Sequence, residues 1–387
     1  MSKSELICDL ARLEELTSEW DALAVSNAAP ESAPAWMLGW WRHIAPPGAE
    51  LRVVAVRDRD ELIGIVPLYV DLGESGPRRC YRLLASDFSG SVTPLALPDR
   101  AWEAAQAVAH ELTQAEPPVG TLRMGALPGT SPWVVALRER WPARVRPLAL
   151  RMEIQEVPTV SLHQESFDAW LQSRNSRFRN NFRRRRRRFA EHGGTERMST
   201  QQTVTKDIDT FIRLHAERWK GRGSSRLVAV GDRLPPLLDE LSGALLAENR
   251  FRLQILEVDG EPICAYLLVA AGGEIVGVNL GWDERFKHLN APSLSMLSMI
   301  EEAFRQGDRR LNFGWGKVDY KREFANGSDT VTWDALLPVG PQLPVALMEV
   351  APAAAKRRVL QSAKRVLPAD EADRLRVLRN RLSRTQS

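Results

Sequence analysis

The sequence predicts an α/β protein built from two similar units, in which mixed central sheets are flanked by helices. Its length of 387 residues exceeds what a single domain commonly holds. Segments with helical apolar spacing alternate with β-branched runs along most of the chain. A two-strand pattern that starts at residue 51 recurs at residue 251. These three observations together predict a duplicated α/β unit.

The first unit is assigned to residues 1–155. Apolar residues at helical spacing predict helices over 13–23, 33–44 and 101–112. Runs rich in Val, Ile, Leu and Tyr predict strands over 51–56, 61–69, 81–85 and 121–124. A Ser/Gly-rich loop at 86–92 follows the third strand and contains Asp87 and Phe88.

The second unit is assigned to residues 156–340, because Pro158 and a polar stretch after it interrupt the pattern. Its first helix is expected over 166–192, where it includes an arginine-rich segment and ends before two glycines. Further helices are predicted over 208–219, 235–248 and 292–304. Strands are predicted over 251–258, 261–269, 273–280, 311–313 and 330–337.

The hairpin of the second unit matches that of the first unit in its layout. Residues 251–258, the turn Asp259-Gly260 and residues 261–269 follow the same order as residues 51–56, a charged turn and residues 61–69. A Pro-led helix and a further strand come later in the second unit, with Pro292 well placed for a first helical turn. The correspondence predicts two copies of one α/β unit.

The composition restricts the kind of protein and its compartment. No apolar run reaches the roughly 18 residues that a membrane-spanning helix needs, and the mixed, acidic N-terminus does not resemble a signal peptide. Cys8, Cys80 and Cys264 are far apart and offer neither a disulfide framework nor a metal-ligand spacing. The six histidines form no metal pattern, and no Ser-His-Asp order is evident. We therefore expect a cytoplasmic protein without a metal.

Basic residues are concentrated in two clusters. Residues 351–387 contain ten Lys/Arg and three Asp/Glu, and residues 174–188 contain nine arginines and no acid. Outside these clusters the chain is acidic, unlike a uniformly basic nucleic-acid binder. The basic tail, assigned to residues 341–387, is expected to form one or two exposed helices. These are either solvated or in peripheral contact with the inner membrane.

The arginine-rich helix leaves several interpretations open. Phe178, Phe182 and Phe189 recur at near-helical intervals, so one face is expected to pack while the rest is solvated. The arginines, among them Arg177 and Arg179, could bind phosphates of CoA, an anionic or lipid-phosphate-linked acceptor, tRNA, or a membrane surface.

Residues 311–324 contain the residue types best suited to chemistry. A short apolar strand leads into a glycine-spaced turn, where the backbone can approach a ligand closely. Asp319, Tyr320 and Lys321 follow in succession and supply a base or acceptor, a donor and a cation. Taken alone, the pattern also fits a polar turn with an exposed lysine, because a single G-x-G is a weak signal.

Three segments support a family resemblance, namely residues 173–184, 281–294 and 313–322. The order of strand, Asp-Gly turn, two strands, Pro-led helix and strand with G-x-G resembles the acyl-CoA-binding fold of the GNAT acetyltransferases. Over roughly residues 10–340 the chain resembles the tandem form of that fold in the FemAB-like group. Within this group it is most similar to the CelD-type proteins linked to cellulose and exopolysaccharide biosynthesis.

The resemblance implies two GNAT-like domains, an acyl-CoA co-substrate and roles for individual residues. Asp319 would deprotonate the attacking amine, Tyr320 would protonate the leaving thiolate, and Lys321 would hold a phosphate or carboxylate of the substrate. Residues 287–294 stand where GNAT enzymes have a glycine-rich pyrophosphate loop, but contain no glycine. A helix N-terminus there still offers free N–H groups. The co-substrate-binding residues assigned from this stretch are Lys287, His288, Asn290, Ser293 and Leu294.

The same resemblance implies an acceptor-binding set. It comprises Asp87, Phe88, Trp282, Asp283, Trp315, Arg177 and Arg179. The loop at 86–92 would face the cleft between the domains, although an ordinary turn aspartate fits the sequence equally well. The tryptophans could stack on a sugar or on pantetheine, or could pack in the core.

These expectations indicate an acyl-CoA-dependent N-acyltransferase that uses acetyl-CoA or another acyl-CoA. Its acceptor would be an amino sugar or other amine of a surface polysaccharide or its precursor. The amine would attack the thioester directly, because no cysteine or serine has a convincing nucleophile setting. Two alternatives stay open: a Fem-like transferase that uses aminoacyl-tRNA on a peptidoglycan precursor, and a catalytically silent GNAT-like binding protein.

Overall fold

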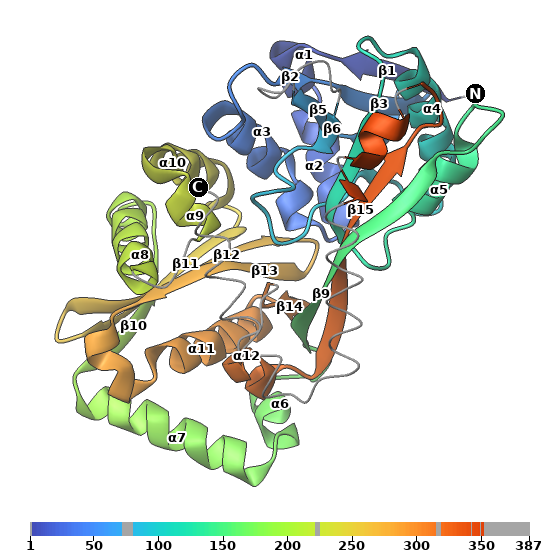
Figure 1. Cartoon of the computed structure of the whole chain (residues 1–387). Helices are drawn as coiled ribbons and strands as arrows, with labels where there is room; N and C mark the ends of the chain where they lie inside the picture. The colour runs from blue at the N-terminus through green and yellow to red at the C-terminus, as the bar shows by residue number, and fades with distance from the viewer. Residues whose placement is uncertain are drawn as a thin grey trace.

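Figure 1 shows the computed structural model of the chain, which describes residues 2–71, 80–220, 225–314, 319–341, 343–348 and 350–351. For Asp319 and Tyr320 the description covers the backbone alone. Helices flank mixed sheets throughout, so the predicted α/β class is confirmed. The predicted basic tail lies outside the described residues from position 352 onwards.

The first part of the chain alternates helices and strands as predicted. Its helices are α1 (Leu10–Glu14), α2 (Thr17–Ser26), η1 (Pro30–Ser32), α3 (Pro34–His43), α4 (Ala101–Gln114) and α5 (Trp133–Arg140). Its strands are β1 (Lys3–Ile7), β2 (Glu50–Leu51), β3 (Val53–Asp58), β4 (Glu61–Val66), β5 (Leu68–Asp71), β6 (Cys80–Leu83), β7 (Leu95–Ala96), β8 (Thr121–Pro128) and β9 (Leu148–Ser161).

The second part repeats this alternation. Its helices are α6 (Phe167–Ser173), α7 (Ser176–Glu191), α8 (Val204–Trp219), α9 (Arg226–Ala229), η2 (Gly231–Arg233), α10 (Leu234–Leu245), η3 (Glu284–Leu289), α11 (Ala291–Arg305) and α12 (Asp319–Phe324). Its strands are β10 (Gly194–Met198), β11 (Phe251–Val258), β12 (Glu261–Ala271), β13 (Glu274–Trp282), β14 (Arg310–Asn312) and β15 (Gly327–Leu337).

The register of the two hairpins confirms the predicted repeat. The β3–β4 ladder is irregular between Val56 and Arg57, and the β11–β12 ladder is irregular between Leu256 and Glu257. Matching positions differ by 200 in number, so the bulge occurs at the same place in both copies. Each copy then makes a parallel crossover, from β6 through α4 to β8 and from β13 through α11 to β14.

The two units share their last two strands. β9 pairs with β14 of the second unit, while β15 pairs with β8 of the first unit. β9 and β15 also pair with each other, from Thr159↔Gly327 to Leu148↔Leu337. One sheet with the order β10-β11-β12-β13-β14-β9-β15-β8-β6-β5-β2 therefore runs through both units. The division predicted between residues 155 and 156 falls inside β9, a strand that serves both units.

A smaller sheet, β1-β3-β4-β7, completes the first unit. The sequence predicts one strand over 61–69, but Pro67 separates β4 from β5, and the two strands join different sheets. Proline has no N–H to donate to a strand ladder, which explains the break.

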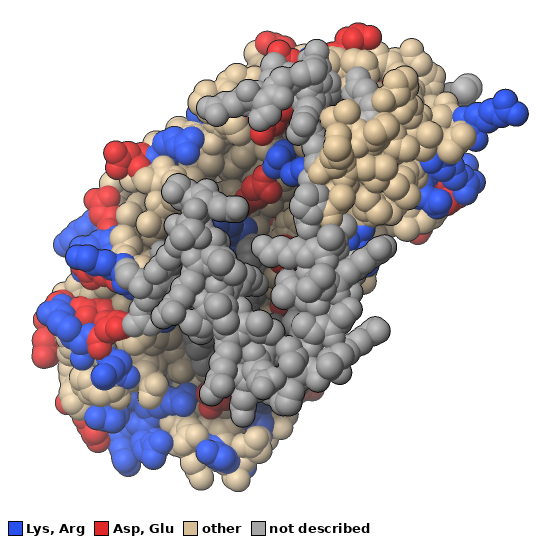
Figure 2. All heavy atoms as spheres, in the orientation of Figure 1, with Lys and Arg blue, Asp and Glu red and all other residues tan. Residues whose placement is uncertain are grey.

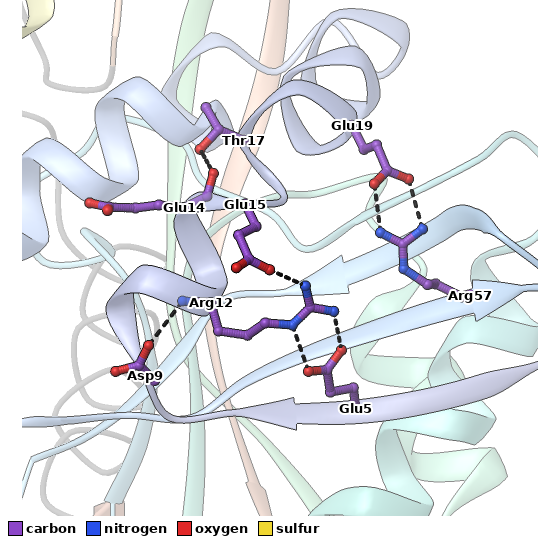
Figure 3. Close-up of polar contacts among 8 residues, drawn as sticks. All are labelled: Glu5, Asp9, Arg12, Glu14, Glu15, Thr17, Glu19 and Arg57. Atoms are coloured by element: carbon purple, nitrogen blue, oxygen red, sulfur yellow. Dashed lines mark hydrogen bonds and ion pairs between the residues drawn. The ribbon is translucent and has the colours of Figure 1, made fainter.

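Ion pairs fasten the first helices to this smaller sheet (Figure 3). Arg12 in α1 donates to both carboxylate oxygens of Glu5 in β1, each at 2.9 Å. Arg57 in β3 donates to both oxygens of Glu19 in α2, at 2.9 and 2.6 Å. Asp9 caps α1 by accepting from the Arg12 backbone N–H at 2.9 Å. Where the sequence predicts one helix over 13–23, the structure thus has two short ones.

A continuous apolar core joins the two units. It extends from Trp36 in α3 to Phe211 in α8. α3 packs on α10, and Gly39 permits the close approach, because a Cβ there would lie 2.9 Å from Leu237 Cδ1. α8 and α10 lie on one side of strands β11 to β13, and α11 lies on the other side (Figure 1).

The arginine-rich helix is two helices rather than the single one predicted over 166–192. α6 ends at Ser173, and Arg174 is extended. Asn175 then caps α7 by accepting from the Phe178 backbone N–H at 2.9 Å. The predicted apolar face of α7 is confirmed, because its three phenylalanines are buried.

Candidate active site

The candidate active site is the opening where β13 and β14 part. β14 pairs with β13 over three positions, which end at Val276↔Asn312. β13 continues to Trp282 and stays paired with β12 on its other side. Among the strands of the described residues, none pairs with β13 beyond Val276 on the β14 side. The backbone of residues 277–282 can therefore pair with an extended ligand there.

Two glycines permit close approach at the apex of this opening. Gly314 follows β14 with φ of 70°, a conformation that favours glycine. A Cβ on Gly314 would lie 3.1 Å from the carbonyl oxygen of Gly277 in β13. A Cβ on Gly277 would in turn lie 2.2 Å from the hydroxyl oxygen of Tyr266 in β12. Larger side chains at either glycine would push these backbone and hydroxyl groups apart.

Lys321 in α12 points its ammonium group at the same apex. Its Nζ donates to the carbonyl oxygen of Phe313 at 2.7 Å and lies 3.5 Å from that of Gly314. Burial beside these neutral carbonyls lowers the pKa of the ammonium from 10.5 to about 8. Lys321 is thus partly buried and bound to backbone carbonyls, unlike the exposed lysine of a simple polar turn.

The neighbours of Lys321 in the predicted set are less fully described. Asp319 and Tyr320 form the first turn of α12, so their backbone lies beside that of Lys321. Their side chains and the whole of Trp315 lie outside the described residues. The acid and base roles of Asp319 and Tyr320 stay predictions.

The predicted co-substrate stretch forms the end of η3 and the start of α11. Lys287 and His288 are exposed, and Asn290 adopts the left-handed conformation (φ 55°, ψ 40°) that turns the chain into α11. Ser293 and Leu294 are buried in the first turn of α11, where their N–H groups bond the Asn290 carbonyl at 3.0 and 3.2 Å. The exposed side chains of this stretch are therefore those of Lys287, His288 and Asn290.

The loop of the first unit places Asp87 and Phe88 in different surroundings. Asp87 is exposed and accepts from Arg82 at 2.8 Å. Phe88 is buried, with its ring centroid 5.8 Å from that of Trp36. Asp87 is therefore the accessible member of this predicted pair.

Trp282 and Asp283 lie at the end of β13, and both have local partners. Asp283 caps η3 by accepting from the backbone N–H of Arg285 at 2.8 Å, and it also accepts from the Arg285 guanidinium. These bonds hold the pKa of the Asp283 carboxyl below its usual range. The guanidinium of Arg218 lies 5.4 Å from the Trp282 ring centroid. Both residues are thus fixed in place beside the opening.

Arg177 and Arg179 lie in the first turn of α7. Arg179 donates to the carbonyl oxygens of Gln172, at 3.1 Å, and of Arg174, which ties α7 to the end of α6. Arg177 is exposed. α7 contacts the site through α12, where the ring centroids of Phe178 and Phe324 lie 5.6 Å apart, and it also contacts η3 and α11.

A buried histidine near the opening was not predicted. His215 in α8 has its Nε2 2.7 Å from the hydroxyl of Ser225 and its Nδ1 3.4 Å from the carbonyl oxygen of Leu280 in β13. Burial lowers the pKa of His215 to about 4, so the ring is neutral at pH 7. An isolated histidine in a helical segment gives no sequence signal for this pairing.

A buried acid between the two units was also not predicted. The carboxylate of Glu31 in η1 accepts from the backbone N–H groups of Gly90 and Ser91, each at 2.7 Å. Arg226 in α9 attracts this carboxylate and donates to the carbonyl oxygen of Ser89. Burial nevertheless raises the pKa of Glu31 to about 6. The partners are far apart in sequence, so no local pattern indicates the cluster.

The second unit matches a known family. Residues 176–322 match the acetyltransferase (GNAT) domain family, and this range contains the opening and Lys321. The chain is therefore an enzyme, a GNAT-type acyltransferase, with two GNAT-like domains as predicted. No curated protein sequence matches the chain.

Solved structures share the fold of nearly the whole chain. FemX is 12% identical with a TM-score of 0.62, over 86% of this chain and 98% of FemX. The C-terminal domain of a putative lysylphosphatidylglycerol synthetase from Agrobacterium fabrum is 12% identical, with a TM-score of 0.54 over 87% and 96% of the two chains. L-PGS from Bacillus licheniformis is 12% identical, with a TM-score of 0.51 over 89% and 97%. At such identities the likeness concerns the fold alone.

Two kinds of feature are absent from the described residues. These residues contain no group of three or more His, Cys, Asp or Glu side chains arranged to hold a metal ion. Within the described ranges, no helix combines the length and the apolar character that crossing a membrane requires.

Proposed function

We propose that the protein is an acyl-CoA-dependent N-acyltransferase that acylates an amino sugar, or a similar amine, of a surface polysaccharide or its precursor. The observation that carries this proposal is the opening between β13 and β14, with the ammonium of Lys321 at its apex. It lies inside the segment that matches the acetyltransferase domain.

The free edge of β13 suits the pantetheine arm of an acyl-CoA. The amides of this arm can pair with the backbone of residues 277–280 as a neighbouring strand would. The phosphates would then lie towards η3 and α11, where Lys287 and His288 are exposed and the helix dipole favours anions. Because Pro292 has no N–H, this helix start offers fewer backbone donors to a phosphate than a glycine-rich loop does. We propose that the positive charge of Lys287 compensates for the missing donors.

The residues around Lys321 would handle the charges and protons of acyl transfer. The amine nitrogen attacks the thioester carbon, the carbon–sulfur bond breaks, the nitrogen loses a proton and the sulfur gains one. We assign Asp319 as the base and Tyr320 as the acid. An ammonium has three N–H donors, and Lys321 directs up to two of them to the carbonyl oxygens of Phe313 and Gly314. We assign its remaining donor to the negative charge that develops on the thioester oxygen.

The acceptor would enter from the side of the first unit. Arg226 bonds the loop of that unit at Ser89, and the adjacent Ser225 bonds His215, which lies against β13. These contacts link the loop that carries Asp87 to the α8 side of the opening. We propose that exposed Asp87 binds the amine or a hydroxyl group of the acceptor, and that Trp282 supplies an aromatic surface for a sugar ring.

A second candidate donor is aminoacyl-tRNA, used in a Fem-like reaction on a peptidoglycan precursor. Two observations favour it: the fold shared with FemX and the glycine-free start of α11. The opening and the role of Lys321 would be the same, while the carrier of the acyl group and the amine that accepts it would differ.

Calorimetric titration with acetyl-CoA tests the donor. We expect saturable binding that weakens in Lys287→Ala and is unchanged in Lys206→Ala, an exposed lysine of α8. Lys321→Ala should still bind acetyl-CoA, while its turnover falls by about 100-fold or more. A folded protein that binds no acyl-CoA would overturn the proposal. Co-purification of charged tRNA would then support the second donor.

We place the reaction in the cytoplasm. Cys8 is exposed, Cys80 and Cys264 are buried, and no disulfide joins them within the described residues, as a reducing compartment allows. The basic tail at 341–387 would provide peripheral contact with the inner membrane.

A further inference from the structure

α7 presents a strongly basic face on the side opposite its buried phenylalanines. The helix contains eight arginines and one glutamate. Five of these arginines are exposed on the outward side and are called the α7 basic face here: Arg177, Arg183, Arg184, Arg187 and Arg188. Figure 2 shows Lys and Arg side chains gathered along the lower edge of the molecule, where Figure 1 places α7.

The protein itself neutralises little of this charge. Arg186, beside the apolar side of the helix, is bound by Glu301 at 2.6 Å. On the α7 basic face, Arg187 lies 3.5 Å from Glu191 in an exposed i,i+4 pair of the kind that contributes little. Within the described residues, the other four arginines of the face form no ion pair. A row of cations held by a rigid helix is therefore available to an external anion.

The C-terminal segment does not supply the missing negative charge. Residues 351–387 contain ten Lys/Arg and three Asp/Glu, so this segment repels a basic helix. The occupant of the α7 basic face must therefore come from outside the chain.

A recess beside the basic face indicates the chemistry of that occupant. It lies between α6, α7 and α11 and has a volume of about 510 Å³. Phe167, Leu171 and Phe182 form its apolar side. Its charged lining consists of three guanidinium groups and two carboxylates, from Arg183, Arg186, Arg187, Asp168 and Glu301. Apolar surface beside cations suits the glycerophosphate region of a phospholipid, whose phosphate adjoins its first methylene groups.

We propose that α7 docks the protein on an anionic phospholipid surface, with the helix axis parallel to the membrane. The helix spans about 24 Å for its 16 residues, so its arginines can contact several headgroups at once. RNA fits the face less well, because single strands bind by stacking on exposed aromatic side chains, and the α7 basic face consists of arginines alone.

Co-sedimentation of the full-length chain with vesicles tests the proposal. We compare vesicles that mix phosphatidylglycerol and phosphatidylcholine with vesicles of phosphatidylcholine alone. Each arginine near an anionic surface contributes about a fivefold change in affinity. Arg187→Gln should therefore weaken binding about fivefold, and the double variant Arg184→Gln/Arg188→Gln about 25-fold. Binding should also weaken as salt is added.

The matched control is Arg213→Gln in α8, because Arg213 forms an exposed i,i+4 pair with Glu217 at 3.6 Å, as Arg187 does with Glu191. It should change vesicle binding less than twofold. Vesicle binding as strong in the α7 variants as in the wild type would overturn the proposal, as would an absence of vesicle binding together with α7-dependent binding of tRNA. Unchanged unfolding midpoints would show that the variants are folded. The readout requires neither acyl-CoA binding nor turnover, so it does not depend on the proposed reaction.

Discussion

Replacement of Lys321 by methionine should reveal the cost of holding an ammonium at the apex of the opening. The side chain is partly buried and its partners are two neutral carbonyls. Its pKa is lowered from 10.5 to about 8, so the unfolded chain binds a proton more readily than the folded protein between these values. Stability from this group therefore rises with pH across that window and is lowest below pH 8.

The magnitude follows from the same shift. Between pH 7 and pH 10, the free energy of unfolding of the wild type should gain about 2.5 kcal/mol relative to Lys321→Met. The hydrogen bonds lost in the variant add a constant offset, which cancels when the two pH values are compared. The variant should also lose acyl transfer, because the cation at the apex is absent.

Urea unfolding of both proteins at a series of pH values measures this difference. Lys206→Met provides the control, because Lys206 is exposed on α8. Its difference from the wild type should vary with pH much less than that of Lys321→Met. A wild-type minus Lys321→Met difference that stays flat from pH 7 to pH 10 would refute the account of a buried ammonium.

Other substitutions test other parts of the structure. The pKa of Glu31 is raised from 4.5 to about 6, so the folded state holds a proton more readily than the unfolded chain between these values. The free energy of unfolding should therefore fall by about 2 kcal/mol as pH rises through this range. In Glu31→Gln this decline should disappear from urea-unfolding curves. Gly314→Ala should lose about 1–2 kcal/mol of stability, because φ is 70° and the new Cβ would meet the Gly277 carbonyl; full activity in this variant would argue against a narrow apex. Arg252→Ala should cost about 3–5 kcal/mol, because it leaves Asp308 buried without its 2.6 Å partner; a cost below about 1 kcal/mol in thermal unfolding would contradict this.

Local patterns in the sequence were sufficient to predict the repeated hairpins and the Pro-led helix. The turn Asp259-Gly260 and the β-branched runs on both sides of it define β11 and β12 without information from the rest of the chain. α11 is specified in the same way, by Pro292 and by the apolar spacing after it.

The exchange of β9 and β15 between the units could not be read from local patterns. β9 carries Arg151, Glu153 and Glu156 among its apolar residues, and Pro158 near its end resembles a boundary. Its role is fixed by pairing with β15, whose residues follow about 180 positions later. Such non-local pairing leaves no periodic signal in either segment.

The candidate site likewise depends on contacts that local sequence patterns do not reveal. The sequence indicates the reactive types at 319–321, but the partial burial of Lys321 depends on how α12 packs beside the end of β14. Phe88 and Asp87 are adjacent in sequence, yet the packing of Trp36 buries only the former. The Glu31–Arg226 contact joins the two units, so it exists only once both have folded.

Hydrogen exchange with and without acetyl-CoA tests the central claim most directly, namely that the opening beside β13 binds the acyl donor. We predict that acetyl-CoA slows exchange of the backbone amides at 277–280 and around Gly314, and that Lys287→Ala reduces this protection. Protection confined to other strands, or no change at residues 277–280 under conditions where acetyl-CoA binds, would contradict it.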